Sequence, residues 1–490
     1  MGETPKTTLP YHATGSPERR EALILVSPFL AGKGLGVKFE RKLHTAWDSK
    51  KEFPVPITPT SSPIPNHPFV DIDSLLQSFQ RFGVHLGLDR IVKLLANLGN
   101  PHYQVPVIHV AGTNGKGSVC AYLSSVLTEA GYRTGRYTSP HLVDWTERIC
   151  FNEQPISLEE LSELFQQVQA AISSDDEYPT QFEVITAAAW LYFAQQQVDV
   201  AVVEVGLGGR LDATNVCSQP LVSIITSISR EHWQQLGPTV ADIAREKAGI
   251  LKPGCPAVVG PLPLDAQKVV RSRIQELECP IFMPQPARQI QTGWAEYQKI
   301  ENSQSIRYPL PLQGQIQLTN SALALAALEI LQKQGWQIPE TAIINGMAKT
   351  KWPGRMQWVK WRNQQLLIDG AHNPAAAQVL RDYVDTLNTQ TVNWVMGMLS
   401  TKEHADIFKA LLRPNDRLHL VPVPDHSSAN PVELAKLAAD ICPELSLCEA
   451  FPDLFSALES AFLSTEDFVV LCGSLYLLGH FLGTSKQCNS

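Results

Sequence analysis

The sequence predicts an α/β protein with a mostly parallel sheet, a phosphate-binding loop and a second, smaller α/β domain. Short apolar runs alternate with amphipathic helical patterns, which is typical of parallel sheets. A glycine-rich turn joins one of these runs to a helix at residues 112–118. The alternation stops near Pro353-Gly354-Arg355 and then restarts, which indicates a second domain. Ligands of such sheets gather at the carboxyl ends of the strands, so polar residues there are the first candidates for function.

Composition sets broad limits on the class of protein. The chain has 490 residues, of which 44% are hydrophobic and 18% charged, enough for about two or three domains with proper cores. Its net charge of −8 argues against a general nucleic-acid binder, because no basic surplus exists to neutralise phosphates. Nine cysteines form no CxxC pair, which fits reduced thiols in a reducing compartment. No apolar run approaches the roughly 18 residues needed to cross a membrane.

Residues 1–67 are expected to form a disordered, proline-rich extension. Six prolines lie between Pro54 and Pro68, with serine and threonine among them, and the segment before them has no sustained apolar period. A transit peptide is the alternative interpretation. Acidic residues before the proline run count against it, namely Glu3, Glu18, Glu21, Glu40 and Asp48.

The glycine-rich turn follows an apolar strand at Val107–Ala111 and precedes a helix at Val119–Ala130. Such a turn presents successive backbone N–H groups at a helix N-terminus, where partial positive charge favours phosphate. Lys116 adds a cation. The spacing departs from the usual phosphate loop, because Val110 occupies the place of the first glycine and Gly117 stands where serine or threonine is expected. An ordinary glycine-rich turn is the alternative.

The remaining elements follow the same alternation of patterns. Helical spacing of apolar residues predicts helices over 75–82, 88–98, 158–168, 182–194 and 319–334. Apolar runs predict buried strands at 200–205 and 222–228 in the first domain and at 366–369, 392–398, 417–421 and 468–472 in the second.

Two residues near strand ends of the first domain are candidate metal ligands. Glu204 ends an apolar strand, and a carboxylate beside a phosphate loop is well placed to hold Mg²⁺. Its alternative is a capping or salt-bridging acid. His232 follows the next strand; taken alone it is more often a surface or core residue, and Mg²⁺ prefers oxygen ligands.

Lys247 lies on a predicted short helix that ends at Gly249. Taken alone it is a solvated lysine. Beside other cations, however, its positive charge is unfavourable, and a neutral lysine amine can react with CO₂ to form a carbamate. That reaction converts a cation into an anion that can bind metal.

The second domain carries a similar strand end. Asp369 and His372 follow an apolar strand, and Asn373 precedes Pro374 as a candidate helix cap. Arg355, just upstream, can reach phosphate as a planar fork. The alternative for Arg355 is a hinge residue with a surface salt bridge.

Together these stretches resemble the folylpolyglutamate synthases and dihydrofolate synthases, relatives of the Mur ligases. The resemblance runs from about Phe69 to Leu482. It rests on six motifs in the right order, namely Leu86-Gly-Leu-Asp-Arg90-Ile, His109-Val-Ala-Gly-Thr-Asn-Gly-Lys-Gly-Ser118, Tyr137-Thr-Ser-Pro-His141, Glu204-Val-Gly-Leu-Gly-Gly-Arg-Leu-Asp-Ala-Thr-Asn215, Arg245-Glu-Lys-Ala-Gly-Ile250 and Asp369-Gly-Ala-His-Asn-Pro374. This family uses the departing form of the phosphate loop.

The resemblance implies a role for each matching residue. The nucleotide would contact Gly112, Thr113, Asn114, Gly115, Lys116, Gly117, Ser118, Asn320, Arg355 and Asp369. The metal ligands would be Ser139, Glu204 and His232, with Lys247 carbamylated. The pterin would contact Leu86, Gly87, Leu88, Asp89, Thr180, Gln181, Phe182, Glu183, Leu211, Asp212 and Ala213. Residues needed for catalysis would be Lys116, Lys247, His372, Asp212 and Arg148.

One position departs from the family pattern, since Ile316 stands where a histidine is usual, beside the retained Gln317. The adenine side of the site is therefore expected to differ. Two other functions are weighed against the family. A Mur-type ligase acting on a UDP-linked peptide is opposed by the Leu86–Arg90 motif. A nucleotide-dependent binding or switch protein is opposed by the joint presence of Glu204, Lys247 and His372.

The resemblance implies a Mur-ligase-like fold, with an ATP-binding domain over 68–350 and a glutamate-ligase domain over 351–490. The expected activity is ATP-dependent addition of L-glutamate to dihydropteroate, to glutamylated tetrahydrofolate, or to both, through an acyl phosphate. The expected cofactors are Mg²⁺, as two ions, and K⁺, with ATP as co-substrate. We expect a cytoplasmic monomer that binds neither nucleic acid nor membrane.

Overall fold

The computed structural model describes Ile72, Leu76 and residues 85–173, 177–300, 304–463 and 468–487. The extension expected over residues 1–67 lies outside the described residues. So does most of the helix expected over 75–82, although Ile72 and Leu76 are both helical and buried. Residues Pro68–Ser490 form one compact unit, which carries every element below.

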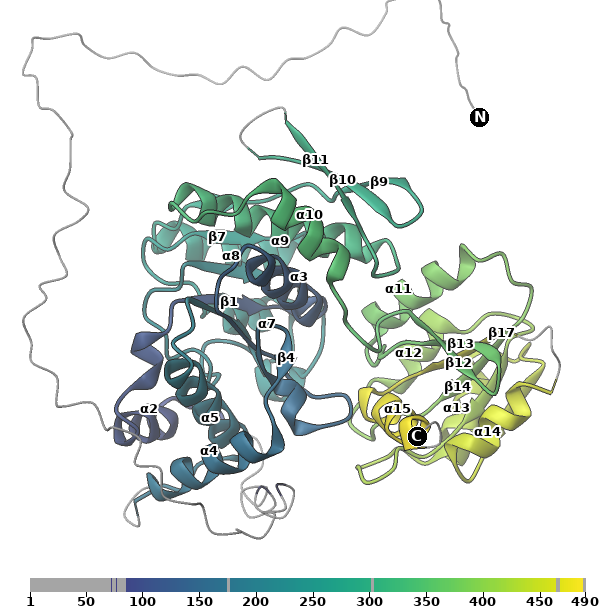
Figure 1. Cartoon of the computed structure of the whole chain (residues 1–490). Helices are drawn as coiled ribbons and strands as arrows, with labels where there is room; N and C mark the ends of the chain where they lie inside the picture. Colours follow the sequence, from purple (N-terminus) through teal and green to yellow (C-terminus); the bar gives the residue numbers. More distant parts are fainter. Residues whose placement is uncertain are drawn as a thin grey trace, which may run out of the picture. The chain divides into compact units, whose positions relative to one another are not determined.

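An eight-stranded sheet forms the first half of this unit (Figure 1). The strands β2, β5, β1, β6, β7 and β8 run parallel to one another. Beyond β2 the sheet continues with β3 and β4, which form antiparallel pairs. In spatial order they are β4 (Gln154–Pro155), β3 (Ile149–Phe151), β2 (Thr134–Tyr137), β5 (Val200–Glu204), β1 (Val107–Ala111), β6 (Val222–Ile225), β7 (Ala257–Val259) and β8 (Ile281–Phe282).

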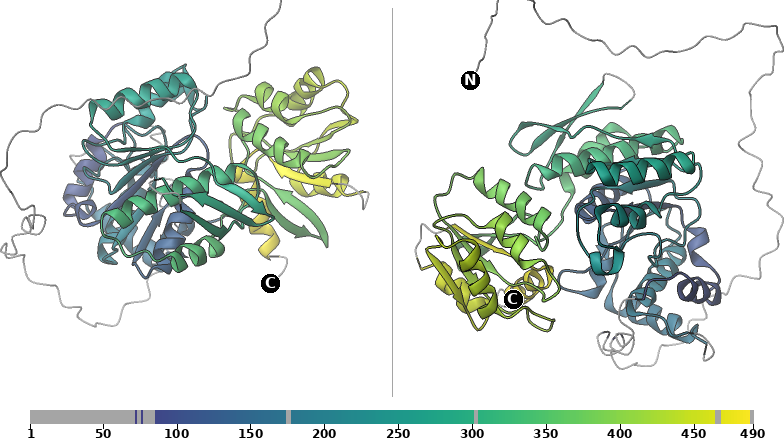
Figure 2. Two further views of the ribbon diagram at one scale, coloured as in Figure 1. Left: turned by 90° about the horizontal axis from the view of Figure 1, so that it is seen from above. Right: turned by 180° about the vertical axis from the view of Figure 1, so that it is seen from behind.

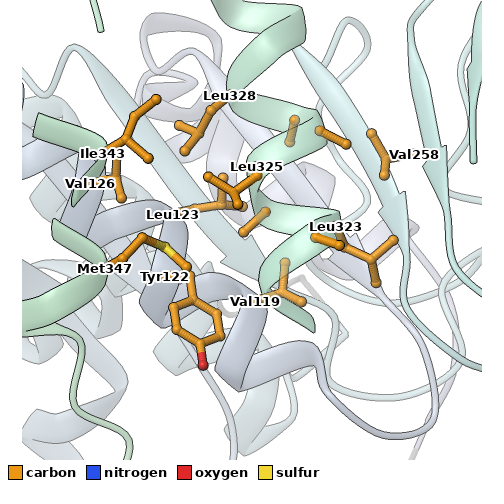
Figure 3. Packing of buried hydrophobic residues seen from close by; sticks show 14 of the residues in the cluster. Val119, Tyr122, Leu123, Val126, Val258, Leu323, Leu325, Leu328, Ile343 and Met347 are labelled. Carbon is orange, nitrogen blue, oxygen red and sulfur yellow. The ribbon is translucent and has the colours of Figure 1, made fainter. Parts of the chain in front are cut away.

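Helices bury both faces of this sheet, so its central strands are buried at every position and consist mostly of apolar residues. Val110 of β1 packs with α3 (Lys116–Glu129), α9 (Ile316–Lys333) and α10 (Glu340–Lys349), and Figure 3 shows side chains of these helices packed together. Val107 of the same strand faces the other way. It packs with α2 (Asp89–Asn97), α4 (Leu158–Ala170) and α5 (Gln181–Gln195).

Shorter elements complete this half. One face of β6 and β7 is covered by α7 (Val240–Ala248) and α8 (Leu264–Glu276). Three short helices form connections, namely η1 (Pro101–Gln104), η2 (Trp145–Arg148) and α6 (Trp233–Leu236).

A three-stranded antiparallel sheet was not predicted from the sequence. It contains β9 (Arg288–Gln291), β10 (Trp294–Gln298) and β11 (Ser305–Pro309). Only alternate residues of β10 and β11 are buried, and they pack against α9. Most of their exposed residues are polar, with Ile290 and Trp294 as exceptions, so these short strands give a weak apolar signal.

A six-stranded sheet forms the second half, seen apart from the first sheet in Figure 2. Its order is β12 (Gln357–Trp361), β13 (Gln364–Ile368), β17 (Phe468–Cys472), β14 (Val392–Met396), β15 (Arg417–Leu420) and β16 (Leu447–Ala450), with only β12 antiparallel. One face packs on α11 (Pro374–Asp385), α12 (His404–Leu411) and α13 (Pro431–Ile441). The other packs on α14 (Leu454–Ala461) and α15 (Leu475–Gln487).

The predicted elements outside the undescribed residues are confirmed, with boundaries shifted by a few residues. The helix expected to start at Thr319 starts at Ile316, and the strand expected to reach Ile228 ends at Ile225. Asn373 caps α11 as expected, because its side chain accepts a hydrogen bond from the N–H of Ala376 at 2.9 Å. Polar residues thus follow the carboxyl ends of β1, β5 and β13.

Candidate active site

The glycine-rich loop connects β1 to α3 in a shape that requires glycine at two positions. Gly112 and Gly115 have φ of +153° and +88°, and a Cβ would collide with the Thr226 side chain at the first and with the Asn320 amide at the second. Backbone contacts hold the loop open toward the helix N-terminus. The N–H of Thr113 donates to the Ser227 carbonyl at 2.7 Å, and the Thr226 hydroxyl donates to the Asn114 carbonyl at 2.7 Å.

A buried carboxylate lies beside this loop. Glu204 ends β5, and its Oε1 is 3.8 Å from the ammonium nitrogen of Lys116 while its Oε2 accepts the N–H of Ser139 at 3.3 Å. Burial raises the pKa of Glu204, and Lys116 opposes this rise. A buried carboxylate with one distant cation has spare capacity for another, which fits a divalent metal ion held by Glu204 and the Ser139 hydroxyl.

Lys247 reaches the same place from α7. Its Nζ donates to the Gly112 carbonyl at 2.7 Å, and the side chain is buried. Burial, followed by the charge of Lys116, lowers the pKa of Lys247 to about 7. A large fraction of this amine is therefore neutral near pH 7, which is the form that reacts with CO₂.

A second carboxylate, which is mostly buried and which we did not predict, joins the two halves. Glu231 Oε1 accepts hydrogen bonds from His372 Nε2 at 2.9 Å and from Lys402 Nζ at 3.3 Å. These partners hold the pKa of Glu231 well below its usual range against the opposing effect of burial. Lys402 lies in the loop that follows β14. The rule that sites form at the carboxyl ends of strands could therefore have predicted Lys402 as a site residue.

His232 lies next to Glu231 at the start of α6, with φ of +52° and Nε2 3.8 Å from Glu231 Oε1. Burial is the main factor that lowers the pKa of His232, and water limits this effect because the side chain keeps 45% exposure. A neutral imidazole at this place can act as a metal ligand.

The second half supplies Asp369 and Arg355. Asp369 accepts the N–H of Met356 at 2.9 Å and that of Ala371 at 2.8 Å, so its carboxylate fixes the turn after β13. Arg355 packs closely on Gly370, where a Cβ would collide with its guanidinium. The amides of Asn114 and Asn373 exchange hydrogen bonds of 3.0 and 3.2 Å, which joins the phosphate loop to the cap of α11.

Most of these residues line one cavity of about 330 Å³, whereas Thr226, Asn373 and Lys402 do not. All ten residues expected to contact the nucleotide line it, together with the three expected metal ligands, Lys247 and His372. Ile316, which replaces the usual histidine, lies in the lining as well. The structure therefore brings together predicted site residues that lie far apart in the sequence, such as Gly112 and His372, which are 260 positions apart.

A second cavity of about 430 Å³ lies beside the first. Of the stretches expected to contact a pterin, the cavity is lined by Leu86, Gly87, Thr180, Gln181, Phe182, Glu183, Leu211, Asp212 and Ala213. Leu88 and Asp89 do not line it. Leu88 packs against the hydrophobic core that includes residues of α2, and Asp89 lines a separate cavity with Arg90 and Lys93.

Two residues expected to act in catalysis make structural contacts. Asp212 accepts hydrogen bonds from the N–H of Leu207 at 2.8 Å and from the N–H and hydroxyl of Thr214 at 3.0 and 2.6 Å, so it shapes the loop after β5. Arg148 is buried, and its Nε donates to His141 Nδ1 at 2.9 Å. Both residues also line the second cavity.

The fold and the site define a class of protein. A phosphate-loop sheet followed by a smaller α/β unit, with buried acids and a lysine at the loop, is the arrangement of Mur-type ATP-dependent ligases. Residues 110–328 match the model of the Mur ligase middle domain, and residues 355–484 match the dihydrofolate synthetase C-terminal domain.

Individual relatives identify the family within this class. The chain is 35% identical to the dihydrofolate synthetase of Saccharomyces cerevisiae, over 81% of this chain and 97% of that protein. It is 35% identical to the dihydrofolate synthase/folylpolyglutamate synthase of Bacillus subtilis, over 84% and 97%. The chain therefore belongs to the dihydrofolate synthase/folylpolyglutamate synthase family and is an ATP-dependent ligase, and the Mur alternative is not supported.

Solved structures agree with this assignment. The E. coli FolC complex with DHPP and ADP has a TM-score of 0.73 at 32% identity, covering 88% of this chain and all of that chain. The Mycobacterium tuberculosis folylpolyglutamate synthase with ADP and AMPPCP has a TM-score of 0.74 at 29% identity, covering 84% and 96%. In the described part of this chain, no helix combines the length and apolar character needed to span a bilayer.

Proposed function

We propose that this chain joins L-glutamate to dihydropteroate and to glutamylated tetrahydrofolate, using ATP. The observation that supports this proposal most directly is that the two cavities meet. Ser139, His232 and His372 line both the phosphate cavity and the cavity beside it. A carboxylic acid bound in one cavity can therefore approach a phosphate bound in the other.

The residues present fit a divalent metal ion. Glu204, Ser139 and His232 offer a buried carboxylate, a hydroxyl and an imidazole next to the phosphate loop, and we propose that they hold two Mg²⁺ ions, with K⁺ as a further ion. When bound, Mg²⁺ neutralises phosphate charge as it develops.

The chain's own residues then act on the two substrates. The loop amides and Lys116 bind the phosphates, and Arg355 adds a planar cation. These positive groups offset the repulsion between the acid substrate and ATP, so that the carboxylate attacks the γ-phosphate and forms an acyl phosphate and ADP. The amine of L-glutamate then displaces phosphate and forms the amide.

His372 has a positioning part in this scheme. Its Nδ1 lies 2.8 Å from the Gly370 carbonyl oxygen and its Nε2 lies 2.9 Å from Glu231. Both ring nitrogens face oxygen acceptors, which fixes the ring where the cavities meet. We propose that this ring orients the incoming glutamate or the transferring phosphoryl group.

The larger organisation is also proposed. The ATP-binding part would extend over 68–350 and the glutamate-ligase part over 351–490. The compact unit that contains both sheets supports catalysis by a single chain, and we propose a monomer in the cytoplasm.

The test uses the purified full chain with ATP, Mg²⁺ and L-glutamate. Dihydropteroate and a tetrahydrofolate are offered in separate reactions, and products are identified by mass. A glutamate adduct in both reactions supports two activities, and an adduct in one restricts the proposal to that substrate. ADP formation without any adduct would contradict it.

A further inference from the structure

The segment between the two sheets starts on the phosphate-loop helix. The hydroxyl of Ser125, in α3, donates to the Gly346 carbonyl at 2.7 Å, and the hydroxyl of Thr350 donates to the same oxygen at 2.9 Å. Lys349 forms an ion pair with Glu129, the last residue of α3 and one turn beyond Ser125, at 2.5 Å. The segment therefore leaves α10 from a position fixed against α3.

Two residues further on, Trp352 packs on the phosphate loop itself. A Cβ added to Gly117 would lie 2.7 Å from Cε2 and 2.9 Å from Nε1 of the indole ring, closer than real contacts allow. Gly117 has no positive φ, so its backbone would accept alanine and only the ring excludes a side chain. The Arg136 guanidinium carbon lies 5.4 Å from the ring centroid, and Arg136 is tied to Glu153 at 2.7 Å.

This contact gives a reason for the unusual loop sequence. The usual phosphate loop has serine or threonine after the lysine, and this chain has glycine. In this chain the indole ring of Trp352, 235 positions later in the sequence, fills the space that a side chain at position 117 would need.

The same segment ends at the residue expected to reach the phosphates. The Gly354 carbonyl accepts the N–H of Gly370 at 2.9 Å, and the N–H of Met356 donates to Asp369 at 2.9 Å. Arg355 lies between these two contacts and lines the phosphate cavity. Arg355 is only three positions from Trp352 in the sequence. The packing of the indole ring against Gly117 therefore limits the positions that the Arg355 guanidinium can reach.

Trp352 also lines a neighbouring cavity of about 660 Å³. That cavity and the phosphate cavity share Gly117, Ser139, Glu204 and Arg355 in their linings. Loss of the indole would therefore widen a water-accessible space next to the reacting phosphate. Water there would hydrolyse an acyl phosphate before glutamate attacks it.

We propose that Trp352 is a positioning residue of the ligase reaction, which docks on Gly117, holds Arg355 toward the nucleotide phosphates and keeps water from the acyl phosphate. The inference rests on the proposed roles of the phosphate loop and Arg355. It assigns to the interdomain segment a direct part in coupling ATP use to amide formation.

The first experiment measures coupling in Trp352→Ala. We expect kcat to fall about tenfold, ATP affinity by calorimetry to change by less than about threefold, and the ADP formed per amide product to rise above the wild-type ratio. Trp352→Phe, which keeps an aromatic ring, should restore most of the coupling. Trp358→Ala removes a half-exposed tryptophan from β12 and is the matched control, with a wild-type ratio expected. A lower melting temperature with unchanged kcat and coupling would show that Trp352 is only structural.

The second experiment tests the contact itself. Gly117→Ala should lower kcat/KM for ATP by at least about tenfold, because its methyl group displaces the ring. Gly117→Ala combined with Trp352→Ala removes that collision, so the double variant should exceed Gly117→Ala in kcat/KM for ATP. Additive losses would overturn the proposal. If the wild-type chain itself forms no amide, the proposed function fails, whereas an active wild type without this rescue refutes only the role of Trp352.

Discussion

The Nζ atom of Lys247 lies 2.7 Å from the carbonyl oxygen of Gly112, the first residue of the phosphate loop. This contact joins α7 to the loop that follows β1. Burial raises the energy of the Lys247 ammonium, and the nearby charge of Lys116 adds to that effect, so the pKa of Lys247 falls to about 7. A lysine in this state is suited to take up CO₂, which removes the repulsion.

Lys247 should be carbamylated and required for full activity. Lys247→Ala should lose most activity, and a short carboxylic acid in solution should restore part of it by filling the vacated anion position. Lys247→Arg should remain inactive, because a guanidinium keeps its charge and forms no such carbamate. Wild-type turnover is compared with and without bicarbonate, and electron density at high resolution identifies the adduct. A bare ammonium in an active, ATP-bound crystal would contradict this prediction.

The unmodified lysine should also leave a pH signature on stability. With a pKa lowered from 10.5 to about 7, the folded state binds fewer protons than the unfolded state between these values. Stability therefore rises with pH across this window, and the cost of burying the ammonium is fully present below pH 7. Lys247→Met should gain most over wild type below pH 7, and that gain should shrink by up to about 1.4 kcal/mol per pH unit above it. Urea unfolding in CO₂-free buffer measures the difference, and a gain independent of pH would refute the lowered pKa.

Lys116→Ala should reduce ATP turnover by roughly 100-fold or more, because it removes a cation that faces developing phosphate charge. The melting temperature without ligand should change little, since the side chain lines a cavity and its only carboxylate contact in the described structure is the 3.8 Å approach to Glu204. Turnover and thermal unfolding are measured on the same preparation. Normal turnover would show that the loop has another purpose.

Arg90 should control binding of the acid substrate. Its Nε donates to the Glu183 carboxylate at 3.1 Å and its Nη2 to the His85 carbonyl at 2.8 Å, and both partners line the second cavity. Arg90→Ala leaves Glu183 without that contact and so disturbs the lining of the cavity. We expect the binding free energy of dihydropteroate to weaken by about 1–2 kcal/mol, so its KM should rise roughly tenfold. KM for ATP serves as the internal control. An equal rise in both constants would indicate general damage.

The second half should depend on the buried Asp416. Its Oδ2 accepts Arg381 Nη1 at 2.9 Å and Trp394 Nε1 at 3.0 Å, and both carboxylate and guanidinium are nearly inaccessible. Asp416→Ala should destabilise the protein by about 3–5 kcal/mol, because it leaves the buried indole N–H of Trp394 without this acceptor and leaves Arg381 with the half-exposed Asp385 as its carboxylate partner. Asp406→Ala removes a surface acid paired with Lys409 and should cost less than about 1 kcal/mol. Equal losses by urea unfolding would disprove the difference between these pairs.

Much of the fold follows from local patterns in the sequence. The strands ending at Ala111 and Glu204 consist mostly of apolar residues because helices cover both faces of their sheet, and that pattern is visible without tertiary information. The rule that sites form at the carboxyl ends of parallel strands then places Glu204 and Asp369 near a ligand. The sheet of β9 to β11 escaped prediction because β9 is exposed at every position, while β10 and β11 bury only alternate residues, against α9.

The features of the candidate site likewise fall into those that the sequence predicts and those that only the tertiary structure reveals. By itself the sequence determined the phosphate loop, its lysine, the acids at the strand ends and the cap at Asn373, because each of these depends on residue type and on neighbours within a few positions. Only the tertiary structure decided that Glu231 accepts from Lys402 and that Trp352 fills the space above Gly117. These pairs are 171 and 235 positions apart, and their contacts arise from the path of the chain between the two sheets. No local sequence pattern encodes that path. Tertiary packing alone therefore determines which residues pair with Glu231 and which side chain lies against Gly117.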